Sequence, residues 1–125
     1  MKLLVDSNAL IWAVSQPAEL AAAARKALLD PDNGRFVSIA AMWEIAIKVS
    51  LRKLSLPDSI PAALKTIDAE PLSIVAEHIL CVQGLPHHHH DPFDRMMIAQ
   101  AMVDGLTIVT RDRAFRAYGV PLLMA

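Results

Sequence analysis

Short apolar runs alternate with longer amphipathic runs along the chain, and this alternation constrains the fold more than any other feature. The run KLLV (2–5) is apolar and ends at polar residues, as a buried strand would, and LTIVT (106–110) repeats the pattern. We expect further strands at 35–38, at 71–74 and at PLLM (121–124). Strands that alternate with helices predict an α/β fold: a parallel sheet of four to five short strands with helices on both faces.

The expected helices lie between and after these strands. They cover the ranges 8–15, 18–30, 39–51, 59–69, 75–84, 92–104 and 111–118. Gly84 closes the range 75–84, and Gly105 stands just past the range 92–104, where a left-handed residue is easiest to accommodate. No repeat, low-complexity linker or charge block divides the chain, so we expect a single domain over 1–125.

Composition limits the kind of partner and the compartment. The net charge is −1, with 12 basic and 13 acidic residues, so any contact with nucleic acid must depend on local geometry. The one cysteine, Cys81, cannot form an intramolecular disulfide, and no apolar run approaches the roughly 18 residues needed to cross a bilayer. We expect a soluble, cytoplasmic protein with no membrane partner. Its apolar fraction of 54% predicts apolar residues outside the monomer core, covered by a dimer or a protein partner.

Acidic residues follow the strands where a parallel sheet binds its ligands, outside the carboxyl ends. Asp6 comes after the first strand and Asp112 after LTIVT. Each also has a simpler explanation, as a helix cap or as a first-turn acid that the helix dipole stabilises. The same holds for DPFD (91–94), where Asp91 suits the cap, Pro92 the first helical position and Asp94 the third.

Glu44 lies in the most apolar of the expected helices, IAAMWEIAIKV (39–49). Lys48, four residues further on, permits an ion pair worth about 0.3–0.5 kcal/mol if it is exposed. A carboxylate among apolar neighbours is costly to desolvate unless it meets a partner charge or a metal ion. We expect Trp12 and Trp43, which fall on apolar helix faces, to pack rather than to stack on bases.

If the second strand pairs beside the first, then Asp6, Glu44, Asp94 and Asp112 converge at one edge of the sheet. Carboxylates a few ångströms apart raise one another's pKa or require a cation. Ligation by oxygen atoms suits Mg²⁺ or Mn²⁺, which bind phosphate oxygens and activate water. The sequence therefore predicts a nuclease in which these four acids are the catalytic and metal-binding residues.

Four blocks of the chain resemble the PIN-domain ribonucleases, and specifically the VapC-type toxins of bacterial toxin–antitoxin pairs. The blocks, in order, are LLVDSNALIW, VSIAAMWEIAIKVSLRKLSLP, LPHHHHDPFDRMMIAQA and GLTIVTRDRAFRAYGVPLL. The resemblance covers nearly the whole chain. It implies a PIN fold, a Mg²⁺- or Mn²⁺-dependent endoribonuclease, an antitoxin that blocks the site, and a homodimer.

The family's acidic positions fall on Asp6, Glu44, Asp94 and Asp112. The resemblance also places supporting hydroxyl groups at Ser7 and Thr110. Ser7 and Asn8 stand where many of these proteins have Thr-His, which leaves the role of residue 8 open but removes no carboxylate.

The run His87 to His90 directly precedes DPFD. Neighbouring side chains point apart, so the run lacks the spacing of one tetrahedral zinc site. We interpret it as a solvated loop. The alternative hypothesis is that some of these histidines flank an RNA cleft and become cationic as the pH falls toward ~6.5.

The charged residues near the acids have two interpretations each. Asp91 is expected to be a cap, with support of the metal site as the alternative. Arg95, Arg111 and Arg113 could bind phosphates or form structural ion pairs. Lys48 could orient Glu44 or contact RNA.

Two other functions fit part of the pattern. An aspartyl-phosphate phosphatase would need a second aspartate two residues after Asp6, where the chain has Asn8, and a receiver domain would need an aspartate after PLSI. A catalytically idle PIN-like module could serve only to hold a protein partner. The complete set of four mutually repelling acids argues against an idle site.

Overall fold

The computed structural model describes residues 1–125 and places a parallel sheet of five strands at its centre, in the order β3-β2-β1-β4-β5. The strands are β1 (Lys2–Val5), β2 (Gly34–Ser38), β3 (Glu70–Leu72), β4 (Thr107–Thr110) and β5 (Leu122–Met124). The α-helices are α1 (Ser7–Ser15), α2 (Ala22–Leu29), α3 (Ile39–Ser50), α4 (Ile60–Thr66), α5 (Ala76–Gly84) and α6 (Pro92–Asp104). The predicted parallel α/β sheet is confirmed.

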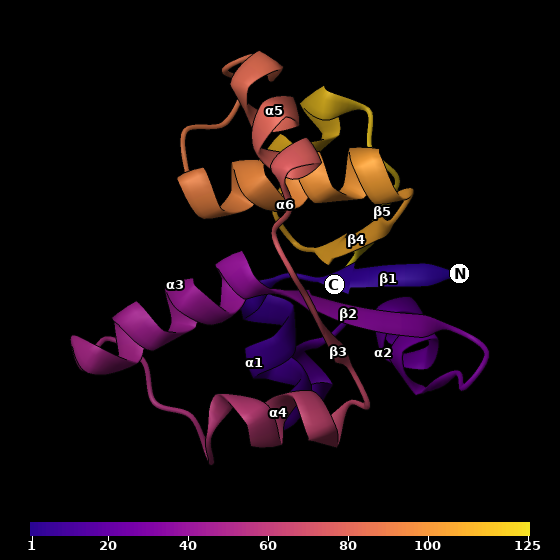
Figure 1. Cartoon of the computed structure of the whole chain (residues 1–125). Helices are drawn as coiled ribbons and strands as arrows, with labels where there is room; N and C mark the ends of the chain where they lie inside the picture. The colour runs from indigo at the N-terminus through magenta and orange to yellow at the C-terminus, as the bar shows by residue number, and fades with distance from the viewer.

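Helices cover both faces of the sheet (Figure 1). Helices α5 and α6 lie on one side of the strands, and α1, α2 and α4 lie on the other. This division follows from the strand order. The chain moves outward from β1 through β2 to β3, and then returns past β1 to β4 and β5. Because the crossovers are right-handed, those that run in opposite directions place their helices on opposite faces. No helix is long and apolar enough to cross a bilayer.

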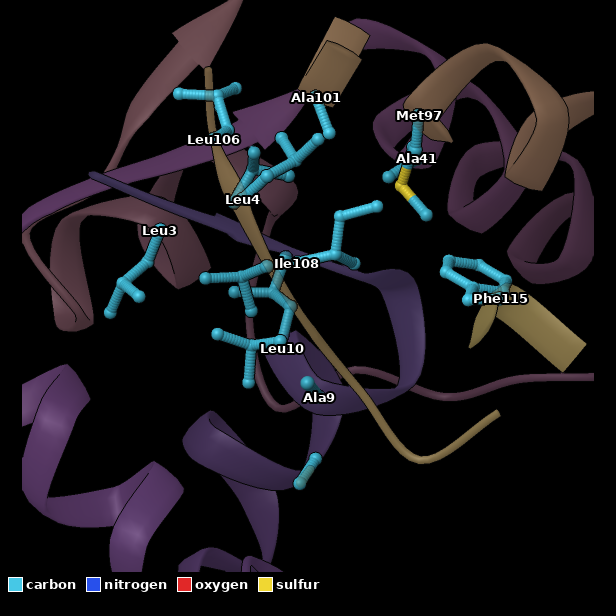
Figure 2. Packing of buried hydrophobic residues seen from close by; sticks show 14 of the residues in the cluster. Leu3, Leu4, Ala9, Leu10, Ala41, Met97, Ala101, Leu106, Ile108 and Phe115 are labelled. Carbon is cyan, nitrogen blue, oxygen red and sulfur yellow. The ribbon is translucent and has the colours of Figure 1, made fainter. Parts of the chain in front are cut away.

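The core lies around β1, the central strand. Leu3, Leu4 and Val5 are fully buried, because helices cover both faces of a central parallel strand and leave no face for polar residues. Figure 2 shows Leu4 beside Ile108 of β4, and Met97 of α6 near Phe115. This packing holds the carboxyl ends of β1 and β4 together.

Two expected helices differ from the structure. Residues 18–30 form a 3₁₀ turn, η1 (Pro17–Glu19), followed by α2, because Leu20 is extended (φ −73°, ψ 140°) and its buried side chain separates the two. Residues 113–118 form a 3₁₀ helix, η2 (Arg113–Tyr118), which begins after the cap Asp112 and ends at Gly119 in the left-handed region (φ 71°).

The expectation that Trp43 packs within the protein is wrong. Its side chain is 62% exposed, and its ring meets Phe93 edge-on with 5.3 Å between centroids. Helix α3 turns Ala41, Glu44 and Ile45 inward, which leaves Trp43 on the outer face. Trp12 is half-buried against the core, with the Arg111 guanidinium 4.0 Å above its ring.

Leu4 tests whether β1 is the centre of the core. Replacing Leu4 with Ala should lower the free energy of unfolding by about 2–5 kcal/mol, because the deletion leaves a cavity between two packed layers. Leu29→Ala is the matched control: that side chain is 77% exposed, so a change of less than about 0.5 kcal/mol is expected. Urea denaturation of both variants measures the difference, and equal effects would contradict this description of the core.

Candidate active site

A pocket of about 190 Å³ opens at the carboxyl edge of the sheet, and no hydrophobic residue lines it. Its lining residues are Asp6, Ser7, Asn8, Glu44, Lys48, Asp91, Asp94 and Asp112. The structure thus brings all four predicted acids to one pocket from four separate parts of the chain. Their part in catalysis stays a prediction.

Asp6 serves both as a helix cap and as a wall of the pocket. Its Oδ1 accepts a hydrogen bond from the backbone N–H of Ala9 (2.8 Å), which begins α1. Its backbone N–H donates to the carbonyl of Val109 (3.1 Å), so the end of β1 is tied to β4. Burial raises the pKa of Asp6, and the negative charges of Glu44 and Asp112 add to this, although hydrogen bonds from Thr110 and Ala9 oppose it.

Glu44 is held at both carboxylate oxygens. The Ser7 hydroxyl donates to Oε1 (2.6 Å), and the Lys48 ammonium donates to Oε2 (3.2 Å). Glu44 is only 8% exposed, whereas the Lys48 side chain is 47% exposed and reaches the pocket from the solvent side. Ser7 and Lys48 therefore fix the direction in which Glu44 points.

Asp91 and Asp94 occupy the first turn of α6. The Asp91 carboxylate accepts a hydrogen bond from the Asp94 backbone N–H (3.0 Å), so the expected cap is present. The pKa of Asp94 is raised to about 7, chiefly by burial and next by the negative charge of Asp91. Glu44 and Asp6 act in the same direction, while the nearby His89 opposes them. Asp94 therefore keeps its proton to a higher pH than an ordinary aspartate does.

Asp112 reaches the pocket from the end of β4. Thr110 is fully buried there, and its Oγ1 accepts a hydrogen bond from the Asp112 backbone N–H (3.0 Å). The Asp112 Oδ1 accepts from the N–H of Ala114 (2.9 Å), and this bond caps η2. Its side chain is 43% exposed, which makes it the acid most open to solvent among those described above.

Among the four histidines, only His89 turns toward the acids. Its Nε2 lies 2.9 Å from Asp112 Oδ2 and 3.1 Å from Asp94 Oδ2. Each of these three side chains offers one atom that could ligate a metal ion. His87, His88 and His90 are exposed, as a solvated loop predicts. Sequence reasoning could not single out His89, because adjacent identical residues carry no signal of which one turns inward.

The arginines beside the acids are mostly engaged elsewhere. The buried Arg95 guanidinium donates to the carbonyls of Pro86 (2.8 Å), Leu85 (3.2 Å) and Val82 (3.3 Å). Arg111 donates to the carbonyls of Ala125 (3.1 Å) and Glu19. The ion pair expected as one alternative is found for Arg111, with Glu19 at 3.8 Å, whereas Arg95 forms no ion pair and its role is structural through hydrogen bonds alone. Of the three arginines, only the exposed Arg113 stays available for phosphate.

The donor set of the pocket fits a divalent cation. Its charged walls are carboxylates, and hard oxygen atoms are what Mg²⁺ and Mn²⁺ prefer. Burial is the main cause of the raised pKa of Asp6 and of Asp94, and neighbouring carboxylates add to it. A bound cation would favour the ionised form of both groups.

A parallel α/β sheet with an acidic pocket at its carboxyl edge is an arrangement in which a bound cation could assist hydrolysis. The chain belongs to the PIN domain family, which matches residues 3–121. It is 27% identical over 128 residues to Ribonuclease VapC22 of Mycobacterium tuberculosis (strain ATCC 25618 / H37Rv), with 95% of this chain and 93% of that protein covered.

Solved structures share the fold at low sequence identity. One chain of VapBC2 from Rickettsia felis, bound to a DNA fragment from its promoter, matches with a TM-score of 0.68 at 16% identity, covering 99% of this chain and 98% of that chain. DNA-bound VapBC from Salmonella typhimurium gives 0.67 at 18% identity, with the same coverage. FitAB bound to the IR36 DNA fragment gives 0.66 at 19%, covering 98% and 94%. The predicted PIN-like fold is confirmed.

The pKa of Asp94 predicts how the stability of the cation-free protein depends on pH. Between pH ~4 and ~7 the folded chain keeps a proton on Asp94 that the unfolded chain loses, so the free energy of unfolding falls as the pH rises through this window. Asp94→Asn should remove this part of the pH dependence. At pH 8 the variant should be more stable than the original chain by about 1–3 kcal/mol, after solvent screening.

Urea denaturation in the presence of a chelator, at pH 5 and pH 8, measures this effect. Asp32→Asn is the control, because Asp32 is exposed and lies just before β2, at the amino ends of the strands and away from the pocket. An identical pH dependence in the original chain and in Asp94→Asn would contradict the description of Asp94.

Proposed function

We propose that this chain is the toxin of a toxin–antitoxin pair, and that it hydrolyses phosphodiester bonds of RNA as a Mg²⁺- or Mn²⁺-dependent endoribonuclease. The observation that carries the proposal is the convergence of four acids, from four parts of a PIN-family chain, on one polar pocket. A cognate antitoxin protein would block this pocket. A cytoplasmic place of action belongs to the same proposal.

In this proposal Asp6, Glu44, Asp94 and Asp112 supply the oxygen atoms that hold the cation. When bound, the cation supplies a nucleophile at neutral pH and stabilises negative charge on the phosphodiester. Ser7 and Lys48 keep Glu44 directed into the pocket through their two hydrogen bonds. Thr110 supports Asp6 and Asp112 at the end of β4, since hydrogen bonds join its hydroxyl group to both residues.

Positive charge for the substrate is local in this proposal. The Lys48 ammonium lines the pocket, and Arg113 is exposed directly after Asp112. With a net charge of −1 the chain has no long-range attraction for RNA, so these two side chains are the candidates for phosphate contact. Arg111, which the sequence also suggested for phosphate binding, is not proposed here, because its guanidinium already donates to the carbonyl groups of Ala125 and Glu19.

RNA and the antitoxin enter the proposal through the relatives. VapC22 is a ribonuclease by name, and the similar solved chains belong to the VapBC and FitAB assemblies. A homodimer is also proposed. Its support is the apolar surface on α5 and α6, where Ile79 is 56%, Leu80 67% and Met102 41% exposed.

The rival functions gain no support from the site. Asn8 is exposed at the position where an aspartyl-phosphate phosphatase needs its second acid, and the chain has the PIN fold rather than that of a receiver. An idle module would have no use for buried acids whose pKa values are raised, because they lower the stability of the fold.

Cleavage of RNA by the purified chain, free of antitoxin, tests the proposal. Total RNA should be cut with Mg²⁺ or Mn²⁺ and should stay intact with a chelator. Asp6→Asn should lower the rate at least about 100-fold, because one charged ligand is lost while the cap can remain.

The Asp32→Asn variant should cleave RNA at the original rate, because Asp32 lies away from the pocket. Circular dichroism checks that both variants are folded. Cleavage that persists in the chelator, or an Asp6→Asn variant with full activity, would overturn the proposal.

A further inference from the structure

His89 lies between two acids that come from different parts of the fold. Asp94 belongs to the first turn of α6, and Asp112 follows β4. The His89 Nε2 is within hydrogen-bond distance of both, at 3.1 Å from Asp94 Oδ2 and 2.9 Å from Asp112 Oδ2. A single ring nitrogen therefore joins two separately anchored walls of the pocket.

The other ring nitrogen determines where the proton is. Nδ1 of His89 lies 3.2 Å from the backbone nitrogen of Asp91, and a backbone N–H can only donate. Nδ1 must then accept, which places the proton of the neutral ring on Nε2, facing the two carboxylates. A histidine that ligates a metal through Nε2 has the reverse arrangement, with Nδ1–H donating to an acceptor. The hydrogen bonds thus favour a donor to the acids over a metal ligand.

The loop that carries His89 is fixed from several sides. The His89 backbone N–H donates to the Tyr118 hydroxyl (2.8 Å), which itself donates to the carbonyl of Pro86 (2.8 Å). Arg95 donates to the same Pro86 carbonyl (2.8 Å), and the His89 ring meets Phe115 edge-on at 5.5 Å between centroids. The ring is 15% exposed, unlike its three exposed neighbours. Its position is thus built into the fold.

We propose that His89 is a positioning residue of the cation site: its Nε2 bridges Asp94 and Asp112, with a hydrogen bond to Asp112 Oδ2 and with Asp94 Oδ2 within ion-pair distance, and this contact holds Asp112 over the pocket. The Asp112 side chain is 43% exposed, and the one other hydrogen bond of its carboxylate is from the Ala114 N–H in the turn that it caps, so the contact with His89 is the one that fixes its Oδ2. His89 has this role only if the proposed cation site exists.

Isothermal titration of the full chain with Mn²⁺ alone tests this role without measuring activity. His89→Ala should raise the Kd for Mn²⁺ about tenfold, as expected when a group that orients a metal ligand is lost. His89→Gln should stay within about threefold of the original chain, because the glutamine amide can present an N–H near the position of Nε2. His87→Ala, in the same loop but exposed, is the control and should leave the Kd unchanged.

A double-mutant cycle separates the bridge from general loosening of the loop. In an Asp112→Ala background, His89→Ala should change the Kd for Mn²⁺ by less than about threefold, because the carboxylate that His89 positions is already absent. Equal weakening by His89→Ala and His89→Gln, unchanged or tighter binding by His89→Ala, or fully additive effects in the cycle would each overturn the role of His89. If the original chain does not bind Mn²⁺, the proposed function fails first, and the role of His89 fails with it.

Discussion

The parallel pairing of β1 with β2 on one side and with β4 on the other is the constraint on which the rest of the structure depends. Because the strands run in one direction, their carboxyl ends lie along one edge, and the elements that follow them start there. Asp6 directly follows β1 and Asp112 lies two residues past the end of β4, and Glu44 lies on α3, which follows β2. The buried apolar strands of the core therefore fix the place where the acids meet.

Local hydrogen bonds offset part of the cost of gathering so many carboxylates. Asp6 caps α1, Asp112 caps η2, and Glu44 accepts bonds from Ser7 and Lys48. These hydrogen bonds do not offset the whole cost of burying the carboxylates, and the pKa of Asp6 and of Asp94 therefore stays raised. The cation-free protein is consequently less stable than it would be with neutral side chains in the pocket, and the binding of a cation would recover that loss.

The sequence predicts the sheet and the position of the acids well, because both depend on strong and simple patterns. An apolar run such as Leu3 to Val5 needs cover on both faces, and the acids after such runs share an edge once the sheet is parallel. The cap at Asp91 was likewise readable from local chemistry, and the left-handed Gly105 (φ 68°) ends α6 as expected.

Other features depend on contacts between distant segments, which a single sequence does not reveal. His89 turns inward because Tyr118 and Arg95 hold its loop. For Arg95 the sequence offers phosphate binding or an ion pair, and its bonds to the carbonyls of Val82, Leu85 and Pro86 depend on how the 82–86 segment packs against α6. Trp43 lies outside because one turn of α3 must direct Glu44 inward, and the apolar pattern of that helix does not mark which side faces the pocket.

The central claim is that acids from separate elements share one divalent cation. Anomalous diffraction from a crystal grown with Mn²⁺ tests it most directly, because manganese is located independently of the protein atoms. The proposed site predicts a manganese peak in the pocket, at about 2.0–2.3 Å from carboxylate oxygens of at least two of Asp6, Glu44, Asp94 and Asp112. A peak elsewhere on the chain, or none at Mn²⁺ concentrations that support cleavage, would contradict it.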